Sequence, residues 1–189
     1  MIDLLQRIKK EHLEVIEKFL ESEGAKILQV VDLCCEVIAK RGKLLIFGNG
    51  GSAADAQHLA GELINRFKKE RIPLPAIALT TDTSVLTAIA NDYDFSLVFV
   101  KQIQALGNKG DLAIAISTSG KSPNVIEALK VAKEMGLYTV GLSGGSGGEM
   151  GAYCDILILV PSTNTPRIQE GHLLFLHIFS ELLEEKLFG

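Results

Sequence analysis

The chain has 189 residues, a formal net charge of −4, 47% hydrophobic residues and 22% charged residues. This length suits a single domain, and the apolar content excludes an intrinsically disordered chain. The acidic balance excludes a general electrostatic affinity for nucleic acid, because proteins that bind the phosphate backbone normally carry a basic face. We therefore expect no nucleic-acid partner, and we expect any bound phosphate to be held locally by backbone N–H groups and hydroxyls.

The cysteines and the N-terminal segment indicate the cellular compartment. Cys34, Cys35 and Cys154 are too few and unsuitably spaced for a disulfide framework or a cysteine zinc site, so we interpret them as small apolar packing residues in a reducing compartment. The first 20 residues are charged throughout and lack the apolar core of a secretory signal, and no run reaches the roughly 18 apolar residues of a membrane span. These features predict a cytoplasmic protein without a membrane partner.

The N-terminal part of the chain has the pattern of helices. Apolar residues recur near the helical period over residues 2–20 and again from Ile27 to Ile38, and Ser22–Gly24 interrupts the pattern. The spacing predicts a helical hairpin within residues 1–41 that takes part in oligomerisation. This hairpin precedes an α/β core with a C-terminal helix at residues 42–189. Together the two parts form a single domain.

From residue 43 onward, short apolar runs alternate with helical patterns. Near-continuous apolar strands of this kind are typical of a parallel sheet that is covered on both faces. The pattern predicts an α/β fold, a doubly wound three-layer αβα sandwich with five parallel strands. The candidate strands are residues 43–47, 75–80, 111–117, 137–143 and 154–160.

The last predicted helix, residues 167–187, is unusually apolar. Its segment 173–188 is apolar nearly all round in the first two turns. A helix that is hydrophobic on all sides is buried on all sides. We therefore expect a homo-oligomer whose interface covers this helix.

A glycine-rich turn, Gly48–Ser52, follows the first strand. In an open α/β sheet, ligands bind beyond the carboxyl ends of the strands. The turn matches a relaxed dinucleotide fingerprint only weakly, because the acidic residue expected about 20 residues later is missing and Asp82 lies well beyond that spacing. It can still direct backbone N–H groups and a helix N-terminus at an anion, and a plain strand-to-helix turn is the alternative.

A serine-rich turn, Ser117–Ser122, follows the third strand. It resembles a nucleotide P-loop only in Gly-Lys-Ser, since Ala115 stands where the first glycine of that motif belongs. Four hydroxyls at a strand end and a helix start suit a single phosphate monoester. Ser122 is also placed to cap the next helix, with Pro123 in its first position, and both roles are compatible.

Two helices carry ionisable or amide side chains at helical spacing. His58 and Glu62 share one face of the helix after the glycine turn, and Gln169 and His177 share one face of the last helix, with His172 beside them. His177 lies in an apolar stretch, where an unpaired histidine is costly. If the two faces meet, the four groups can hold a divalent metal such as zinc, or supply a general acid and base.

The segments GNGGSAADAQH (48–58), STSGKS (117–122) and RIQEGH (167–172), in that order, resemble the sugar isomerase (SIS) domain family. Nearly the whole chain is similar to the phosphoheptose isomerase branch of that family. The resemblance implies conversion of sedoheptulose 7-phosphate into D-glycero-D-manno-heptose 7-phosphate through an enediol, the first step towards the ADP-heptose of bacterial lipopolysaccharide. It also implies a homotetramer with active sites at subunit interfaces and one zinc ion per subunit.

The resemblance assigns roles to individual residues. The serine turn, with Ser117, Thr118, Ser119 and Ser122, matches the phosphate site, and the glycine turn, with Asn49, Gly50, Gly51 and Ser52, matches the sugar contacts. Asn91 and Asp92 match an Asn-Asp pair near the substrate. The implied metal ligands are His58, Glu62, Gln169 and His177, of which Glu62 and Gln169 also face the substrate. Glu62 and His177 match the catalytic acid and base. The segment before Arg167 reads NTP, where some relatives carry an aspartate.

Two alternatives remain within the same family. SAADAQH, INRF, PAIAL and VLTAIAND also resemble a non-catalytic branch that binds the replication initiator and regulates chromosome replication. That branch lacks the acid and base at the positions of Glu62 and His177, so their presence favours an enzyme. An isomerase acting on a pentose or hexosamine phosphate is the other alternative.

Overall fold

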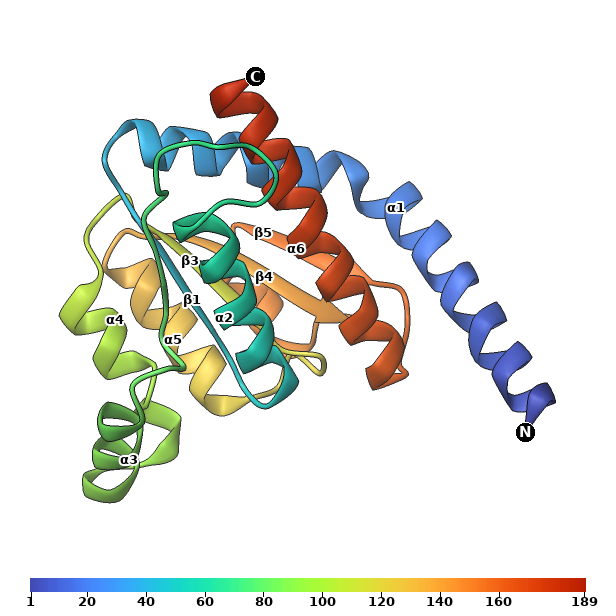
Figure 1. Ribbon diagram of the computed structural model, residues 1–189. Helices are drawn as coiled ribbons and strands as arrows, with labels where there is room; N and C mark the ends of the chain where they lie inside the picture. Colours follow the sequence, from blue (N-terminus) through green and yellow to red (C-terminus); the bar gives the residue numbers. More distant parts are fainter.

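A five-stranded parallel sheet forms the centre of the molecule (Figure 1). The structure is a computed structural model that describes all residues from Met1 to Gly189. The strands lie in the order β2-β1-β3-β4-β5, and the register pairs Gly48 with Ile116, so that β1 and β3 end side by side. Their bounds are β1 (Leu44–Gly48), β2 (Ala76–Ala78), β3 (Leu112–Ile116), β4 (Tyr138–Gly144) and β5 (Ile156–Val160).

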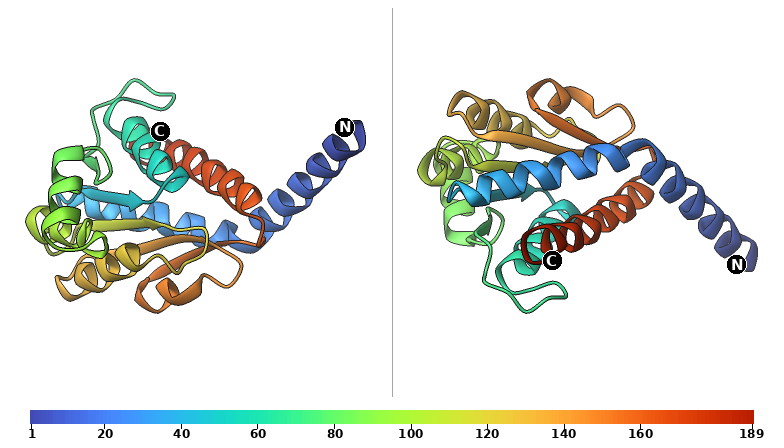
Figure 2. Two further views of the ribbon diagram at one scale, coloured as in Figure 1. Left: turned by 90° about the horizontal axis from the view of Figure 1, so that it is seen from below. Right: turned by 90° about the horizontal axis from the view of Figure 1, so that it is seen from above.

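Helices cover both faces of the sheet (Figures 1 and 2). Alternate residues of β1 point to opposite faces, so Leu44 and Ile46 join a core with the first, second and last helices, while Leu45 and Phe47 join a second core with α4 and α5. This arrangement confirms the predicted three-layer αβα sandwich. The helices are α1 (Ile2–Ala39), α2 (Gly51–Ile64), α3 (Thr83–Asp92), α4 (Val100–Leu106), α5 (Pro123–Glu134) and α6 (Thr165–Phe188), with short 3-10 turns η1 (Phe95–Leu97) and η2 (Gly148–Tyr153).

The predicted N-terminal hairpin was wrong, because residues Ile2–Ala39 form one continuous helix. A glycine inside a helix costs only about 1 kcal/mol, and contacts around Gly24 bridge the apparent break. Glu23 accepts a hydrogen bond from the backbone N–H of Leu159 (3.3 Å), and Lys26 donates one to the carbonyl of Leu157 (3.2 Å). The edge strand β5 therefore holds α1 helical through the segment that its own sequence disfavours.

The N-terminal part of α1 projects away from the rest of the molecule (Figure 2). Its apolar side chains at Ile2, Leu5 and Leu13 are more than half exposed. The last helix, α6, is largely covered within the chain itself, with Phe175, Leu176, Phe179 and Leu183 buried and Leu173 exposed. The clearest unpartnered apolar surface therefore lies on α1 and not, as expected, on α6.

No helix is both long enough and apolar enough to cross a bilayer.

The three cysteines are unpaired. Cys34 is buried in the core formed by α1, α2 and α6, and burial raises the pKa of its thiol far above the usual range. Burial likewise raises the pKa of Cys154 to about 12. Such thiols stay protonated and unreactive, which agrees with their interpretation as packing residues.

Candidate active site

The glycine turn is built by two backbone constraints at the end of β1. A Cβ on Gly48 would lie 2.6 Å from the carbonyl oxygen of Ile116, so only glycine allows the close approach to β3. Gly50 has a φ of 56°, in the left-handed region that favours glycine, and it begins α2 without a side-chain cap. The N-terminus of α2 therefore presents backbone N–H groups that no side chain of the protein caps.

The serine turn begins beside the glycine turn, at the end of β3. The hydroxyl of Ser117 lies 3.2 Å from that of Ser122 and accepts a hydrogen bond from the N–H of Gly120 (3.2 Å). Ser122 occupies the cap position of α5, with Pro123 next to it, but its side chain makes no capping hydrogen bond. The predicted capping role of the Ser122 hydroxyl was therefore wrong, and this hydroxyl faces Ser117 instead.

An amide pair joins the two turns. Asn49 and Asn124 each donate a side-chain hydrogen bond to the other, both at 2.8 Å, and Asn124 is buried. Sequence reasoning missed Asn124. Its only signal was a polar side chain in the first turn of α5, on the helix that follows the serine turn. The pair fixes the glycine turn relative to the serine turn.

A polar cleft of about 270 Å³ opens next to the serine turn. Thr118, Ser119 and Lys121 line one part of it, and Ser162, Thr163 and Thr165, around the start of α6, line another. The cleft combines hydroxyls and one ammonium group, and Ile168 is its one hydrophobic residue. These are the groups that recognise a phosphate or a sugar.

The ionisable faces of α2 and α6 meet, as the hypothesis required. His58 Nε2 lies 2.9 Å from Glu62 Oε1 and 3.4 Å from His177 Nε2. The two imidazole rings cross at 74° with their centroids 5.1 Å apart. One ligand atom from each of the three residues lies within 4.8 Å of the other two. Three potential proton carriers therefore converge, although His177 lies more than 110 positions from the other two in the chain.

The donor set of this cluster fits a divalent metal ion. Ligand atoms about 2.0–2.1 Å from a tetrahedral zinc ion stand about 3.3–3.4 Å apart, which is close to the separation of the two Nε2 atoms. Gln169, the fourth predicted ligand, lies on α6 with its amide against Gly51, and it makes no hydrogen bond with the other three. Three of the four predicted ligands thus form the cluster, and Gln169 borders the glycine turn.

Asn91 and Asp92 are not brought into contact with the other predicted residues. Both are exposed at the end of α3, where Asn91 donates a hydrogen bond to Asp92 (2.9 Å). The chain just after them does reach the site, since Asp94, Phe95 and Ser96 line a cleft of about 290 Å³ together with Asn49, Ser122 and Asn124.

Two further titratable groups lie near the site: Asp55, which sequence reasoning missed, and His172, to which it gave no role. Asp55 lies one turn before His58 on α2, and burial raises the pKa of its carboxyl to about 6, against an opposing effect of His58. His172 on α6 is fully buried, and burial lowers its pKa to about 4. Neither ring nitrogen of His172 makes a hydrogen bond of good geometry, and the nearby backbone of Ser143 offsets the effect of burial only in part. Their burial depends on the packing of α2 and α6, which the local sequence does not reveal.

Comparisons with known proteins cover nearly the whole chain. A family model described as SIS domain matches residues 9–144. The chain is 56% identical to a phosphoheptose isomerase of Burkholderia pseudomallei (strain 1710b) over 165 residues, which are 87% of this chain and 84% of the relative. It is 53% identical to phosphoheptose isomerase 1 of Campylobacter jejuni over 185 residues, 98% of this chain and 99% of the relative. A solved phosphoheptose isomerase from Neisseria gonorrhoeae matches with a TM-score of 0.90 and 41% identity, over 96% of this chain and 99% of that one.

Proposed function

Since this chain belongs to the SIS domain family, we propose that it is a phosphoheptose isomerase that converts sedoheptulose 7-phosphate into D-glycero-D-manno-heptose 7-phosphate. The observation that carries the proposal is the convergence of His58, Glu62 and His177 in a chain more than half identical to relatives of that name. An aldose–ketose isomerisation needs a carboxylate and an imidazole close together, and this chain supplies both.

The phosphate end of the substrate would bind at the serine turn. The hydroxyls of Ser117, Thr118, Ser119 and Ser122 would donate hydrogen bonds to phosphate oxygens. The dipole of α5 would stabilise the phosphate at its N-terminus by about 0.3–1 kcal/mol. Lys121 lines the same cleft and adds a positive charge. The glycine turn, with Asn49, Gly50, Gly51 and Ser52, would contact the sugar hydroxyls, together with Gln169, Asn91 and Asp92.

Glu62 and His177 would carry the protons of the reaction. The Glu62 carboxylate takes the proton from C1 of the ketose while the carbonyl oxygen at C2 gains one, which gives the enediol. His177 exchanges protons at the two oxygens, and return of the carbon-bound proton to C2 gives the aldose with no net gain or loss of protons. His58 Nε2 lies 2.9 Å from the carboxylate oxygen and so restricts its orientation.

His58, Glu62, Gln169 and His177 are the residues that would hold a zinc ion, one per subunit. A bound divalent ion would polarise the substrate carbonyl as a Lewis acid. The ligand spacing in the cluster supports this part of the proposal.

We also propose that the protein is a cytoplasmic homotetramer with active sites shared between subunits. The exposed apolar side chains on the projecting part of α1 support an oligomer, because large apolar surfaces on a free helix are normally covered. The unpaired cysteines support a reducing compartment.

The decisive experiment is incubation of the pure protein with sedoheptulose 7-phosphate, with and without added zinc, followed by NMR detection of the aldose phosphate. We expect the heptose 7-phosphate to appear. Absence of turnover under both conditions, in a folded oligomer, would contradict the proposal and direct attention to the non-catalytic branch or to another sugar phosphate.

A further inference from the structure

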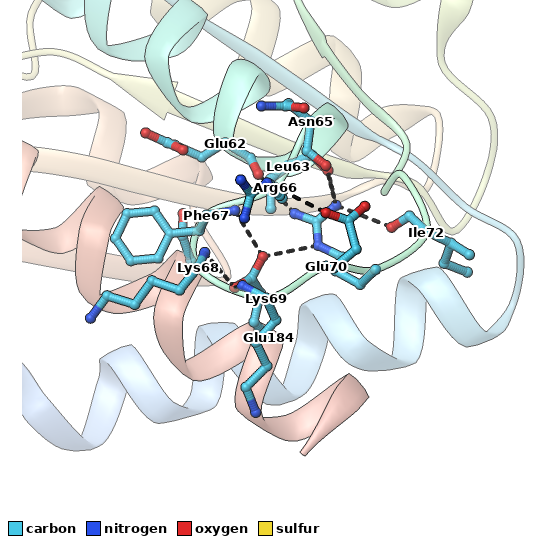
Figure 3. Close-up of polar contacts among 12 residues, drawn as sticks. Glu62, Leu63, Asn65, Arg66, Phe67, Lys68, Lys69, Glu70, Ile72 and Glu184 are labelled. Atoms are coloured by element: carbon cyan, nitrogen blue, oxygen red, sulfur yellow. Dashed lines mark hydrogen bonds and ion pairs between the residues drawn. The ribbon is translucent and has the colours of Figure 1, made fainter.

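A buried ion pair joins the loop that follows α2, the helix of the proposed base, to α6, the helix of the proposed acid. Arg71, in the loop between α2 and β2, donates from Nε to Glu184 Oε1 on α6 at 3.0 Å, and the two side chains are only 1% and 3% exposed. Figure 3 shows Glu184 directed into this loop. The same carboxylate accepts hydrogen bonds from the backbone N–H groups of Phe67 (2.8 Å), Lys68 (2.8 Å) and Lys69 (2.9 Å). The carboxylate is thus fully engaged by the loop, which compensates for its burial.

The other end of Arg71 closes the C-terminus of α2. Its guanidinium donates to the carbonyl of Glu62 (2.8 Å) and to that of Leu63 (2.6 Å), and also to the carbonyls of Asn65 and Ile72. The last carbonyls of a helix have no partner within the helix. Arg71 supplies that partner at the residue whose side chain is the proposed base.

The loop that Glu184 holds also touches the proposed acid. The ring of Phe67 lies against that of His177, with centroids 5.6 Å apart and planes inclined by 31°. His177 and Glu184 are two turns apart on one face of α6. The pair of Arg71 and Glu184 therefore connects the backbone of Glu62 with the ring that packs on His177, without touching the clefts that line the substrate site.

We propose that Arg71 and Glu184 are positioning residues of the isomerase: they fix residues 65–72 between α2 and α6, and so set the orientation of His177 and its separation from Glu62. The proposal rests on the proposed function for its kinetic consequence only. Small misplacement of catalytic groups is costly, since about 1 Å can reduce the rate by a factor on the order of 100.

The test compares Glu184→Gln with Glu185→Gln. Glu185 is the next residue on α6 and forms an ion pair with Lys69 at 2.8 Å, but at the surface, so it is a matched control. For Glu184→Gln we expect kcat to fall about 10- to 100-fold while KM for the sugar phosphate changes less than about threefold, because the serine turn is untouched. Glu185→Gln should match the wild type. Both are assayed well below their melting temperatures.

A second readout does not depend on turnover. The chain has four histidines, so the imidazole signals of His58 and His177 can be resolved by NMR of histidine-labelled protein. We expect both signals to shift in Glu184→Gln and to stay in place in Glu185→Gln. If the wild type fails to turn over sedoheptulose 7-phosphate, the proposed function fails, while these signals still test the positioning role.

A folded Glu184→Gln variant with wild-type kcat and unmoved histidine signals would overturn the inference. If that variant does not fold, Phe67→Leu replaces it, because it removes the ring beside His177 and keeps the backbone N–H that Glu184 binds. We then expect a smaller loss of kcat in the same direction with a shifted His177 signal. Unchanged kcat and an unmoved signal in Phe67→Leu would equally overturn it.

Discussion

Single buried side chains near the site are either saturated with hydrogen bonds or kept neutral. Burial disfavours the charge of Glu184, but hydrogen bonds from the N–H groups of Lys69, Phe67 and Lys68, and from Arg71, outweigh it and lower the pKa to about 2. For His172, burial outweighs the opposing effect of the Ser143 backbone and lowers the pKa to about 4, so the ring is neutral in the fold at neutral pH. The first group stays charged and anchors a loop, while the second makes stability depend on pH.

Glu62→Gln tests the proposed base directly. The change keeps the volume and removes the carboxylate that takes the carbon-bound proton, so we expect turnover of sedoheptulose 7-phosphate to be lost while the circular dichroism spectrum and the oligomeric state persist. The measurement is the NMR assay described above. Activity near that of the wild type would remove Glu62 from the mechanism.

His172 should weaken the fold in mild acid. Its pKa is about 4 in the fold and about 6.5 in the unfolded chain, so below pH 6.5 the unfolded chain binds a proton that the fold does not. The free energy of unfolding should therefore fall by up to roughly 3 kcal/mol as the pH drops from 6.5 to 4. Urea titrations at several pH values should show a shallower dependence in His172→Phe than in the wild type, and equal slopes would contradict the prediction.

Two glycines inside helices show how tertiary packing decides what an element tolerates. Gly24 in α1 has nothing within 4 Å of the position of an added Cβ, whereas a Cβ on Gly171 in α6 would lie 2.6 Å from a methyl group of Val160. The first glycine only weakens its helix. The second allows α6 to approach β5.

We expect opposite effects from the same substitution at these two positions. Gly24→Ala should stabilise the protein by about 0.5–1 kcal/mol, because alanine restricts the unfolded chain and favours the helix. Gly171→Ala should destabilise it by about 1–3 kcal/mol through overpacking. Thermal or urea unfolding of the two variants measures both values, and a destabilised Gly24→Ala would show that α1 is strained at this residue.

The whole molecule is asymmetric, with one helix that extends beyond the core it helps to form (Figure 2). Leu13 and Leu20 lie two turns apart on one face of α1, and both are exposed. In the proposed homotetramer, these side chains are covered by another copy. The proposed shared active sites would then couple assembly to catalysis.

The double variant Leu13→Glu, Leu20→Glu tests this coupling. Two charges on the exposed face of α1 should dissociate the oligomer and abolish turnover together, because apolar interfaces do not accept unpaired carboxylates. Light scattering after size exclusion gives the mass, and the isomerase assay gives the activity. A smaller species with full activity would refute shared sites, and Glu14→Gln on the same helix serves as a control.

The fold was predictable because its signals are local. Each central strand is a continuous apolar run, since both of its faces are buried, and each run ends in a glycine or serine turn that starts a helix. The resemblance to the SIS domain family rests on the same short segments and is confirmed. The hairpin was predicted wrongly because the contacts of Glu23 and Lys26 with β5 override a weak local signal at Gly24.

The candidate site was likewise predictable only where its signals are local. Helical spacing placed His58 with Glu62 and Gln169 with His177, and turn chemistry identified the two turns, because these depend on neighbours within a few residues. The meeting of α2 with α6, the amide pair of Asn49 and Asn124, and the ion pair of Arg71 and Glu184 join residues 75 to 119 positions apart. Such pairings depend on how the helices pack on the sheet, and no periodicity within one segment encodes them.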